Sequence, residues 1–269
     1  MTHRRKARFG WRPSPPDIRD FKLSVPGDVL QNLPPSVDLR SQCPPILDQG
    51  QIGSCTANAL SAAVQFDRMK QGLQPSFVPS RLFIYFNERT IEGDVPLDGG
   101  AFLRDGIKSL ASQGVCPEDQ WPYVPTPPFV DGGAFPTGSA PVTQPPQSCY
   151  DTAANYRIAQ YQAVDQSLPQ LRGTLAQGNP FVFGFSVYTN WDDGQSTPAT
   201  VIPLPSGDAS QNGGHAVMVV GYDDSKSLFT IHNSWGTDLG DSGYFYMPYA
   251  YATDSTLASD FWVIQTTSD

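Results

Sequence analysis

Seventeen of the 26 prolines fall into two stretches of the chain, eight in residues 13–45 and nine in residues 117–146. Proline fixes the backbone φ angle and lacks a donor N–H, so neither stretch can form a long helix or a central strand. Glycine and proline together make up 50 of the 269 residues, while charged residues are only 16%. This composition excludes a helical bundle or coiled coil. Regular structure is therefore expected between and after the two stretches.

Between the proline stretches the sequence predicts helices, and after the second it predicts short strands. Ala59, Ala63 and Phe66 recur at helical spacing, with Ser54 placed to cap that helix and Gly72 to end it. The connections between the later segments are too short for parallel crossovers, so we expect an α+β fold with antiparallel pairing. The predicted helices are residues 56–70, 80–90, 101–112 and 168–177, and the predicted strands are 181–187, 216–222, 228–231, 244–247 and 261–265.

Charge is distributed unevenly along the chain. Residues 1–35 carry seven Lys and Arg against three acids, a net charge of +4, whereas residues 36–269 carry ten against 23, a net charge of −13. We therefore expect residues 1–35, here called the arm, to dock on the acidic body. The acidic body argues against nucleic acid as a partner, because phosphate binding needs a basic surface. For the arm, three alternatives stay open: a solvated tail, a strap that stabilises the fold, and an occluder of a cleft.

The sequence predicts neither a membrane span nor a secretory signal peptide. The longest aliphatic run, residues 216–220, is far shorter than the roughly 20 residues that cross a bilayer. Basic residues follow Met1, but residues 9–13 (FGWRP) stand where a Sec signal has an apolar segment. We expect a cytoplasmic protein by default, with export by another route left open, and no membrane partner.

The four cysteines and three histidines show no metal-binding signature. No two cysteines form a CxxC pair, and no two histidines have the i, i+4 spacing of helical zinc ligands, so we expect no metal. A chain of this length can bury enough apolar surface to need no disulfide. We expect Cys43, Cys116 and Cys149 to be buried or free thiols, with one pairing among them left open and the compartment undecided.

One cysteine stands where a helix is predicted to begin. Cys55 would feel the positive end of the helix dipole and free N–H groups, which favour the thiolate and can stabilise an oxyanion. Gln49 supplies an amide donor from the loop before it. His215, predicted at the edge of a strand, can act as the base, and Asn233 can orient its imidazole without adding a charge. His232 would point to the opposite face of an extended segment, and we interpret it as structural.

Three segments carry a resemblance to a known family. QGQIGSC at 49–55, GGHAVMVVGYDD at 213–224 and HNSWGTDLGDSGY at 232–244 together resemble the papain-like cysteine peptidases, in the family's order. The resemblance extends to SVDLR at 36–40, to DGG at 98–100, and to EDQWPY at 118–123. It covers roughly residues 36–266.

The resemblance implies a papain-like α+β fold, with a helical domain, an antiparallel β-barrel domain and the active-site cleft between them. We accordingly expect three parts: the arm at 1–35, a mainly helical domain at 36–148 with the nucleophile, and a mainly β domain at 149–269 with the histidine and asparagine. The implied activity is that of a cysteine endopeptidase, which cleaves protein or peptide substrates through a thioester and needs no cofactor. We expect it to be a monomer.

The resemblance also implies roles for individual residues. It makes Cys55 the nucleophile, His215 the general acid and base, and Asn233 the residue that orients the imidazole. Gln49 would donate to the oxyanion, and Trp235 would shield the hydrogen bond between histidine and asparagine. The implied substrate-binding residues are Gly99, Gly100, Phe102, Gly214 and Trp235, with Gly100 pairing with the substrate backbone.

The sequence departs from the family's usual pattern at several positions. Ile52 replaces a cysteine three residues before the nucleophile, so the corresponding disulfide cannot form, and Thr56 replaces the tryptophan after the nucleophile. Gly214 stands where Asp or Asn is often found. A short leader stands where the family usually has a long helical propeptide. Such a short leader resembles that of a bacterial branch of the family.

The chemistry of the implied site leads to further expectations. The helix terminus and His215 should lower the pKa of the thiol, and the thiolate should raise that of the imidazole. The pocket for the substrate's second side chain is implied to be small or apolar, with Asp260 as its one potential charge partner, so we expect an apolar side chain there. Two rival functions stay open: acyl transfer to an amine at the same site, and a binding module that has lost turnover.

Overall fold

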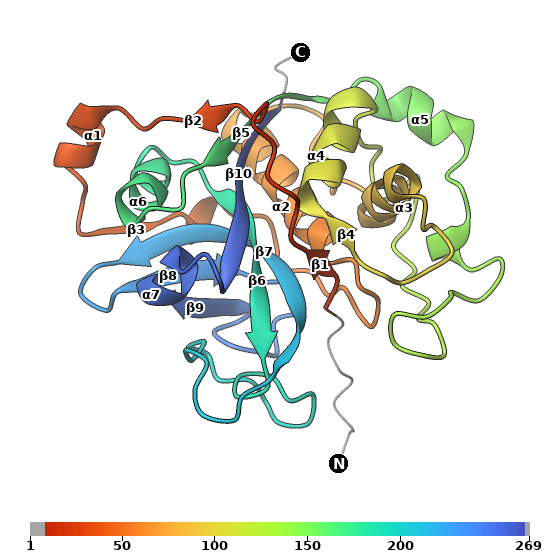
Figure 1. The fold of residues 1–269 in the computed structure, drawn as a ribbon. Coiled ribbons are helices and arrows are strands. Elements are labelled where there is room, and N and C mark those ends of the chain that lie inside the picture. Colours follow the sequence, from red (N-terminus) through yellow and green to blue (C-terminus); the bar gives the residue numbers. More distant parts are fainter. Residues whose placement is uncertain (1–8, 267–269) are drawn as a thin grey trace.

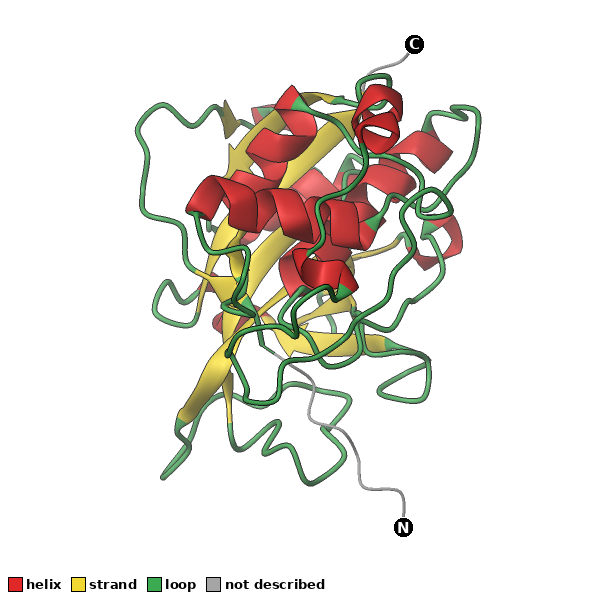
Figure 2. Cartoon of the chain, turned by 90° about the vertical axis from the view of Figure 1, so that its right-hand side faces the viewer, coloured by secondary structure: helices red, strands yellow, loops and turns green. Residues whose placement is uncertain are grey.

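A computed structural model describes residues 9–266 of the chain. The helices at 55–70, 81–92, 103–112 and 147–153 gather at the centre and on one side (Figure 1). The large twisted sheet lies on the other side, together with the short helices at 27–31, 168–176 and 249–253, and the arm runs between the two sides. Seen after a 90° turn, the helices stand in front of the strands (Figure 2). The helices are α1 (Gly27–Gln31), α2 (Cys55–Lys70), α3 (Arg81–Glu92), α4 (Leu103–Ser112), α5 (Gln147–Ala153), α6 (Leu168–Ala176) and α7 (Tyr249–Thr253), with 3₁₀ turns at Arg40–Gln42 and Ala140–Val142.

The large sheet has the strand order β2-β5-β10-β6-β7-β8-β9, with β3 paired to β7. From β5 to β9 every neighbouring pair is antiparallel, which confirms that prediction. Because this order runs from β2 to β9 without returning, the described sheet is open, and the antiparallel β-barrel expected from the resemblance does not close on itself. The strands are β1 (Trp11–Arg12), β2 (Lys22–Leu23), β3 (Ser36–Asp38), β4 (Ala101–Phe102), β5 (Ile158–Val164), β6 (Phe181–Tyr188), β7 (Gln211–Asp223), β8 (Leu228–His232), β9 (Tyr244–Pro248) and β10 (Ala258–Thr266).

The predicted helices form, with corrections at their starts. Ser54 was expected to cap α2, but its side chain makes no capping bond and instead shares a hydrogen bond with the hydroxyl of Tyr123 at 2.6 Å. Gly72 follows the end of α2 in a left-handed conformation, as predicted. Residues 101–102 are strand rather than helix, because β4 pairs in parallel with β1 of the distant arm.

Strand β7 is longer than predicted, and this changes the setting of His215. The ladder to β6 begins at Gln211, so His215 lies inside the strand opposite Phe185 rather than at its edge. The partner strand β6 is buried along nearly its whole length, so the ladder between β6 and β7 lies in the core. Strand β5 alternates only weakly between buried and exposed side chains, which is why the sequence did not predict it.

Helix α2 lies at the centre of the molecule and joins the two sides. It contacts α3 and α4 on one side and β7 and β10 on the other. Its small side chains Ala57, Ala59 and Ala63 are buried, and they allow strand and helix backbones to approach closely. The N-terminus of α2 is thereby held against the middle of β7. No described helix is long and apolar enough to cross a membrane.

Candidate active site

Cys55 is the first residue of α2, and its side chain is completely buried. Its thiol contacts the backbone of Ala216, the residue after His215, and the backbone of Gly10 in the arm. Helix α2 and strand β7 therefore bring the predicted nucleophile and the predicted base together at one point.

His215 is held by a hydrogen bond and by aromatic rings. Its Nε2 lies 2.7 Å from Oδ1 of Asn233, which follows the end of β8. The imidazole stacks on Trp235 with ring centroids 4.7 Å apart, and Trp191 also stacks on that indole, with centroids 5.4 Å apart. The second ring nitrogen, Nδ1, is buried and has no hydrogen-bond partner among the described residues. That nitrogen is the one left to accept a proton.

Gln49 is fixed by hydrogen bonds on both ends of its amide. Its Nε2 donates to the carbonyl of Ile52 at 3.1 Å, and its Oε1 accepts from the hydroxyl of Ser234 at 2.7 Å. The loop it belongs to is tied down by Asp98, whose Oδ1 accepts from the N–H of Gly53 at 2.8 Å. Sequence reasoning grouped Asp98 with the substrate-binding glycines, but it missed this tether and the part of Ser234.

A further buried carboxyl group lies behind the nucleophile. Thr56 donates from Oγ1 to Oε2 of Glu88 at 2.9 Å, and both side chains are fully buried. Burial raises the pKa of Glu88 to about 8, although the hydrogen bond from Thr56 opposes the shift. Sequence reasoning missed Glu88, since its position on the buried face of α3 was the only available signal.

The arm passes through the site as an extended chain. The carbonyl of Gly10 accepts from the N–H of Ala101 at 2.7 Å, and β1 continues in parallel along β4. A Cβ built on Gly10 would lie 1.7 Å from the carbonyl oxygen of Gly53, so only glycine fits beside the nucleophile loop. The Phe9 ring meets the rings of His215 and Trp235 edge to face, each with centroids 6.2 Å apart.

Trp11 fills the next pocket along the cleft. Its indole lies against Gly184 and Gly214, where an added Cβ would come within 2.7 Å of its ring atoms. Its Nε1 donates to Oδ2 of Asp260 at 3.0 Å. The carboxyl group of Asp260, the potential charge partner noted above, stands in the wall of this pocket, and the pocket holds the largely apolar side chain of Trp11. The expected preference for an apolar side chain stays a prediction. Burial raises the pKa of Asp260, while hydrogen bonds from Ser14 and Trp11 oppose that rise.

Beyond the cleft the arm follows the outside of the body. Strand β2 pairs in parallel with β5, and Arg104 holds the arm through the carbonyl of Pro15 and the carboxylate of Asp20. The predicted docking of the arm is thus confirmed, and both open alternatives, occluder and strap, describe part of it. The basic residues Arg4, Arg5, Lys6 and Arg8, on which the charge argument also relied, lie outside the described residues.

Burial reverses the predicted pKa shifts of Cys55 and His215. Burial raises the pKa of the Cys55 thiol to about 12, although backbone hydrogen bonds oppose the shift. Burial also lowers the pKa of His215 to about 4, against the hydrogen bond that the imidazole makes to Oδ1 of Asn233. The expectation of a lowered thiol pKa and a raised imidazole pKa is therefore wrong for this arm-bound structure. The reason is that exclusion of water disfavours both charged forms more than the helix terminus stabilises the thiolate.

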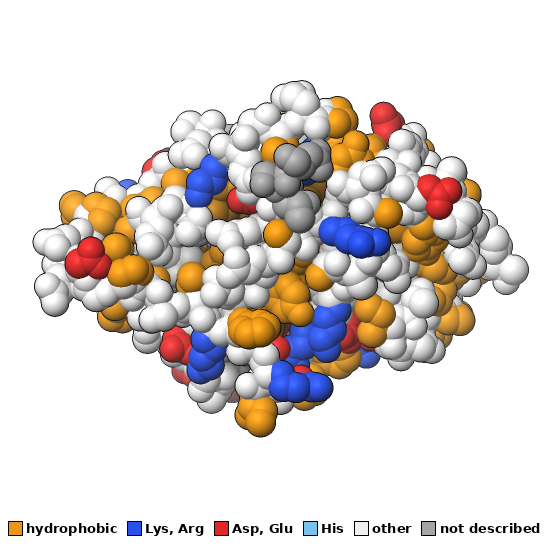
Figure 3. Space-filling model, turned by 90° about the horizontal axis from the view of Figure 1, so that it is seen from above, with side chains coloured by type: hydrophobic (Ala, Val, Ile, Leu, Met, Phe, Trp, Pro, Cys, Tyr) orange, Lys and Arg blue, Asp and Glu red, His pale blue; other side chains and the backbone are white. Residues whose placement is uncertain are grey.

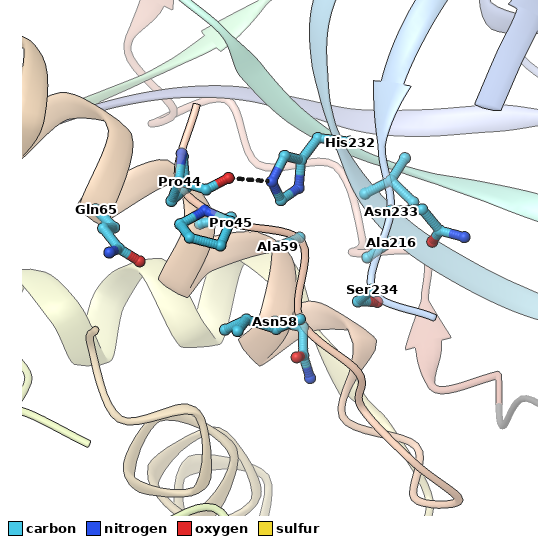
Figure 4. Close-up of a pocket in the computed structure, with 12 residues that line it drawn as sticks. Pro44, Pro45, Asn58, Ala59, Gln65, Ala216, His232, Asn233 and Ser234 are labelled. Carbon is cyan, nitrogen blue, oxygen red and sulfur yellow. Dashed lines mark hydrogen bonds between the residues drawn. The ribbon is translucent and has the colours of Figure 1, made fainter. Parts of the chain in front are cut away.

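The remaining predicted residues separate into those in the cleft and those outside it. Gly100 is buried against Gly10, whereas Gly99 is exposed beside Asp94. His232 points away from the site, as predicted, and its Nε2 lies 3.0 Å from the carbonyl of Pro44 in a small pocket between α2 and the sheet (Figure 4).

All four cysteines are free thiols, so no pairing among Cys43, Cys116 and Cys149 forms. Within residues 9–266, no three His, Cys, Asp or Glu side chains gather as a metal site would require. On the face seen in Figure 3, basic side chains lie among acidic, apolar and neutral ones.

Comparison with known proteins decides the family. The sequence profile of the papain family cysteine proteases matches residues 33–263. The chain belongs to the papain family. Among solved structures, xylellain, a cysteine protease from Xylella fastidiosa, is 49% identical over all of this chain and 99% of its own, with a TM-score of 0.93.

Other relatives of the family are more distant. An uncharacterized peptidase C1-like protein of Acanthamoeba polyphaga mimivirus is 35% identical over 97% of this chain and 88% of its own length. A cathepsin B-like protein of Giardia intestinalis is 32% identical over 85% of this chain and 74% of its own. A procathepsin B of Trypanosoma congolense shares the papain fold, with a TM-score of 0.72 at 18% identity over 97% of this chain and 87% of its own.

Proposed function

We propose that this papain-family protein is a cysteine endopeptidase in which Cys55 attacks the substrate carbonyl. The observation that carries this assignment is the geometry of His215, whose Nε2 is committed to Asn233 while Nδ1 lies buried without a partner. That arrangement leaves one nitrogen to take the thiol proton and holds the ring in place while it does so.

The proposed reaction runs through a thioester. The Cys55 thiolate adds to the amide carbonyl, and the oxyanion is stabilised by the Cys55 N–H at the start of α2 and by Nε2 of Gln49. His215 then protonates the leaving amine, and water cleaves the thioester with His215 as base. Trp235, stacked on the imidazole, keeps solvent from its bond to Asn233.

The arm adds regulation to this activity. With Gly10 against the thiol and Trp11 in the neighbouring pocket, no substrate can reach Cys55. We propose that the full-length chain is held inactive by the arm and acts, as a monomer, on peptide or protein substrates once the arm is displaced or removed. With the expected division into a helical part and a β part, the proposal puts the nucleophile and the base on opposite walls of the cleft.

The test is turnover of fluorogenic peptide amides by the full-length chain and by its Trp11→Ala variant. Cleavage that is lost in Cys55→Ala, together with one equivalent of iodoacetamide incorporated at Cys55, would support the proposal. Products formed with an added amine separate hydrolysis from acyl transfer. Binding of peptides without any cleavage by the Trp11→Ala variant would contradict an enzymatic function.

A further inference from the structure

The side chain of Arg12 leaves β1 and enters an acidic recess at the end of α3. Its guanidinium forms an ion pair with Glu92 and lies 3.4 Å from Oδ2 of Asp94. The carbonyl oxygen of Gly100 accepts from the same nitrogen at 3.4 Å, and the ring of Phe102 lies 4.5 Å from the guanidinium carbon. Two carboxylates, a carbonyl and an aromatic face are the groups that recognise guanidinium.

The recess is built by the body of the protein. The Glu92 side chain is only 4% exposed, and its Oε1 accepts from the N–H of Phe102 at 2.8 Å, so β4 orients the carboxylate. Oδ1 of Asp94 is buried and has no hydrogen-bond partner among the described residues. The nearby Arg89 directs its N–H groups to backbone carbonyls, among them that of Tyr85. Among the ion pairs of the described residues, both carboxylates pair with Arg12 of the arm.

The recess is the third position along the cleft, counted outward from Cys55. Moving away from Cys55, Gly10 touches the nucleophile loop, Trp11 fills the pocket walled by Asp260, and Arg12 follows. In the ladder, Trp11 is opposite Ala101 and Arg12 is opposite Phe102. The arm runs parallel to β4 and away from Cys55 in its N-to-C direction. The residues before a scissile bond run toward Cys55, so a substrate passes the same three points in the opposite direction. Phe102, expected among the substrate-binding residues, contacts Arg12 at this third position.

We propose that Glu92, Asp94 and Phe102 form a subsite that selects a guanidinium side chain at the third substrate residue before the scissile bond. This inference rests on the proposed function, because it assigns the substrate class of that cleft. Arg12 is then the resident competitor: the arm occupies the subsite with the side chain that the subsite binds best. Citrulline, which has nearly the shape of arginine without its charge, separates charge recognition from size.

The experiment uses two forms of the full-length chain that carry Trp11→Ala and Arg12→Ala to empty the cleft, one with Cys55 and one with Cys55→Ala. Peptide amides that differ only at the third residue carry Arg, Lys, citrulline or Glu. We measure kcat/KM with the first form and Kd with the second. Arginine should exceed citrulline by about 10- to 100-fold in both, mainly through KM and Kd, and glutamate should be poorest.

Variants of the recess assign the preference. Glu92→Gln and Asp94→Asn keep the side-chain shapes and should each reduce the preference for arginine, while Asp151→Asn on α5 removes a distant charge and should leave it unchanged. Equal Kd values for the arginine and citrulline peptides would overturn the subsite. Selective binding to the Cys55→Ala form without turnover by the Cys55 form would instead uphold the subsite and contradict the endopeptidase function.

Discussion

The two halves of the arm contact the body in different ways. Residues 9–14 insert Trp11 and Arg12 into recesses of the cleft, and Gly10 meets the nucleophile loop. Residues 17–31 lie on the outside, where β2 adds one short ladder to β5 and Val25 packs against α6. The difference shows that the arm can both block the active site and stabilise the fold. Residues 9–14 block the site, and residues 17–31 pack on the body.

The largest expected effect tests what the inserted half covers. Cys55→Ala removes the thiol and should lower peptidase activity to below detection. Replacing one buried sulfur by hydrogen should change the melting temperature by only a few degrees, about 1 kcal/mol or less. Turnover and thermal unfolding, measured side by side, check both parts. Activity at a few per cent of wild type would remove Cys55 from its assigned role.

The next effect separates the two halves directly. Trp11→Ala should empty the pocket beside Asp260 and raise the rate of Cys55 alkylation by about 10-fold or more, because the arm loses its largest buried contact. The matched variant is Val25→Ala in the outer half, where the side chain is 3% exposed. It should cost about 1–3 kcal/mol of stability with little gain in alkylation. Equal changes in alkylation rate and in stability for the two variants would contradict the separate roles of the two halves of the arm.

The pH dependence of alkylation should sharpen the same contrast. In the arm-bound chain the raised pKa of Cys55, about 12, keeps the thiol protonated at pH 7, so alkylation should be slow and should rise toward alkaline pH. Burial is the main cause, so Trp11→Ala should shift the profile to lower pH and bring it nearer the bell shape expected for an open site. Identical profiles for the two proteins would show that the arm does not set the ionisation.

The smallest effect concerns the outer half's surface charges. Lys22 and Asp165 form an ion pair at 2.9 Å, but their side chains are 69% and 54% exposed. Lys22→Gln should change the free energy of unfolding by about 0.5 kcal/mol or less and leave alkylation unchanged, because exposed pairs are screened by solvent. Denaturant unfolding at low and high salt checks this. A loss of several kcal/mol would mean that charge, rather than β2 pairing and Val25 packing, holds this half.

Much of the site was predictable because the residues next to each candidate in the sequence indicate its chemical role. A cysteine at a helix start, a glutamine in the loop before it, and an asparagine next to a strand end are features of neighbouring residues. The structure brings Cys55, His215 and Asn233 together in the arrangement those settings suggest. Their roles in catalysis stay predictions until the variants above are measured.

Other features could not be predicted from local sequence. The start of α4 was predicted two residues too early, because residues 101–102 pair with strand β1 of the arm. The length of β7 was underestimated, because it depends on the ladder with β6. The pKa shifts of Cys55 and His215 were predicted with the wrong sign, since burial is a property of the folded molecule. Asp260 was noted only as a potential charge partner, with no indication of what it would meet.

The sequence by itself determined the longer helices, the central strands and the identity of the reactive groups, because helical spacing, strand composition and side-chain chemistry act over a few residues. Only the tertiary structure decided what surrounds those groups. The bond from Trp11 to Asp260 joins positions 249 residues apart, and the ion pair of Arg12 with Glu92 joins positions 80 apart. Such contacts follow from how the chain packs, and it is packing that excludes water, shifts the pKa of Cys55 and decides which side chains the cleft can accept.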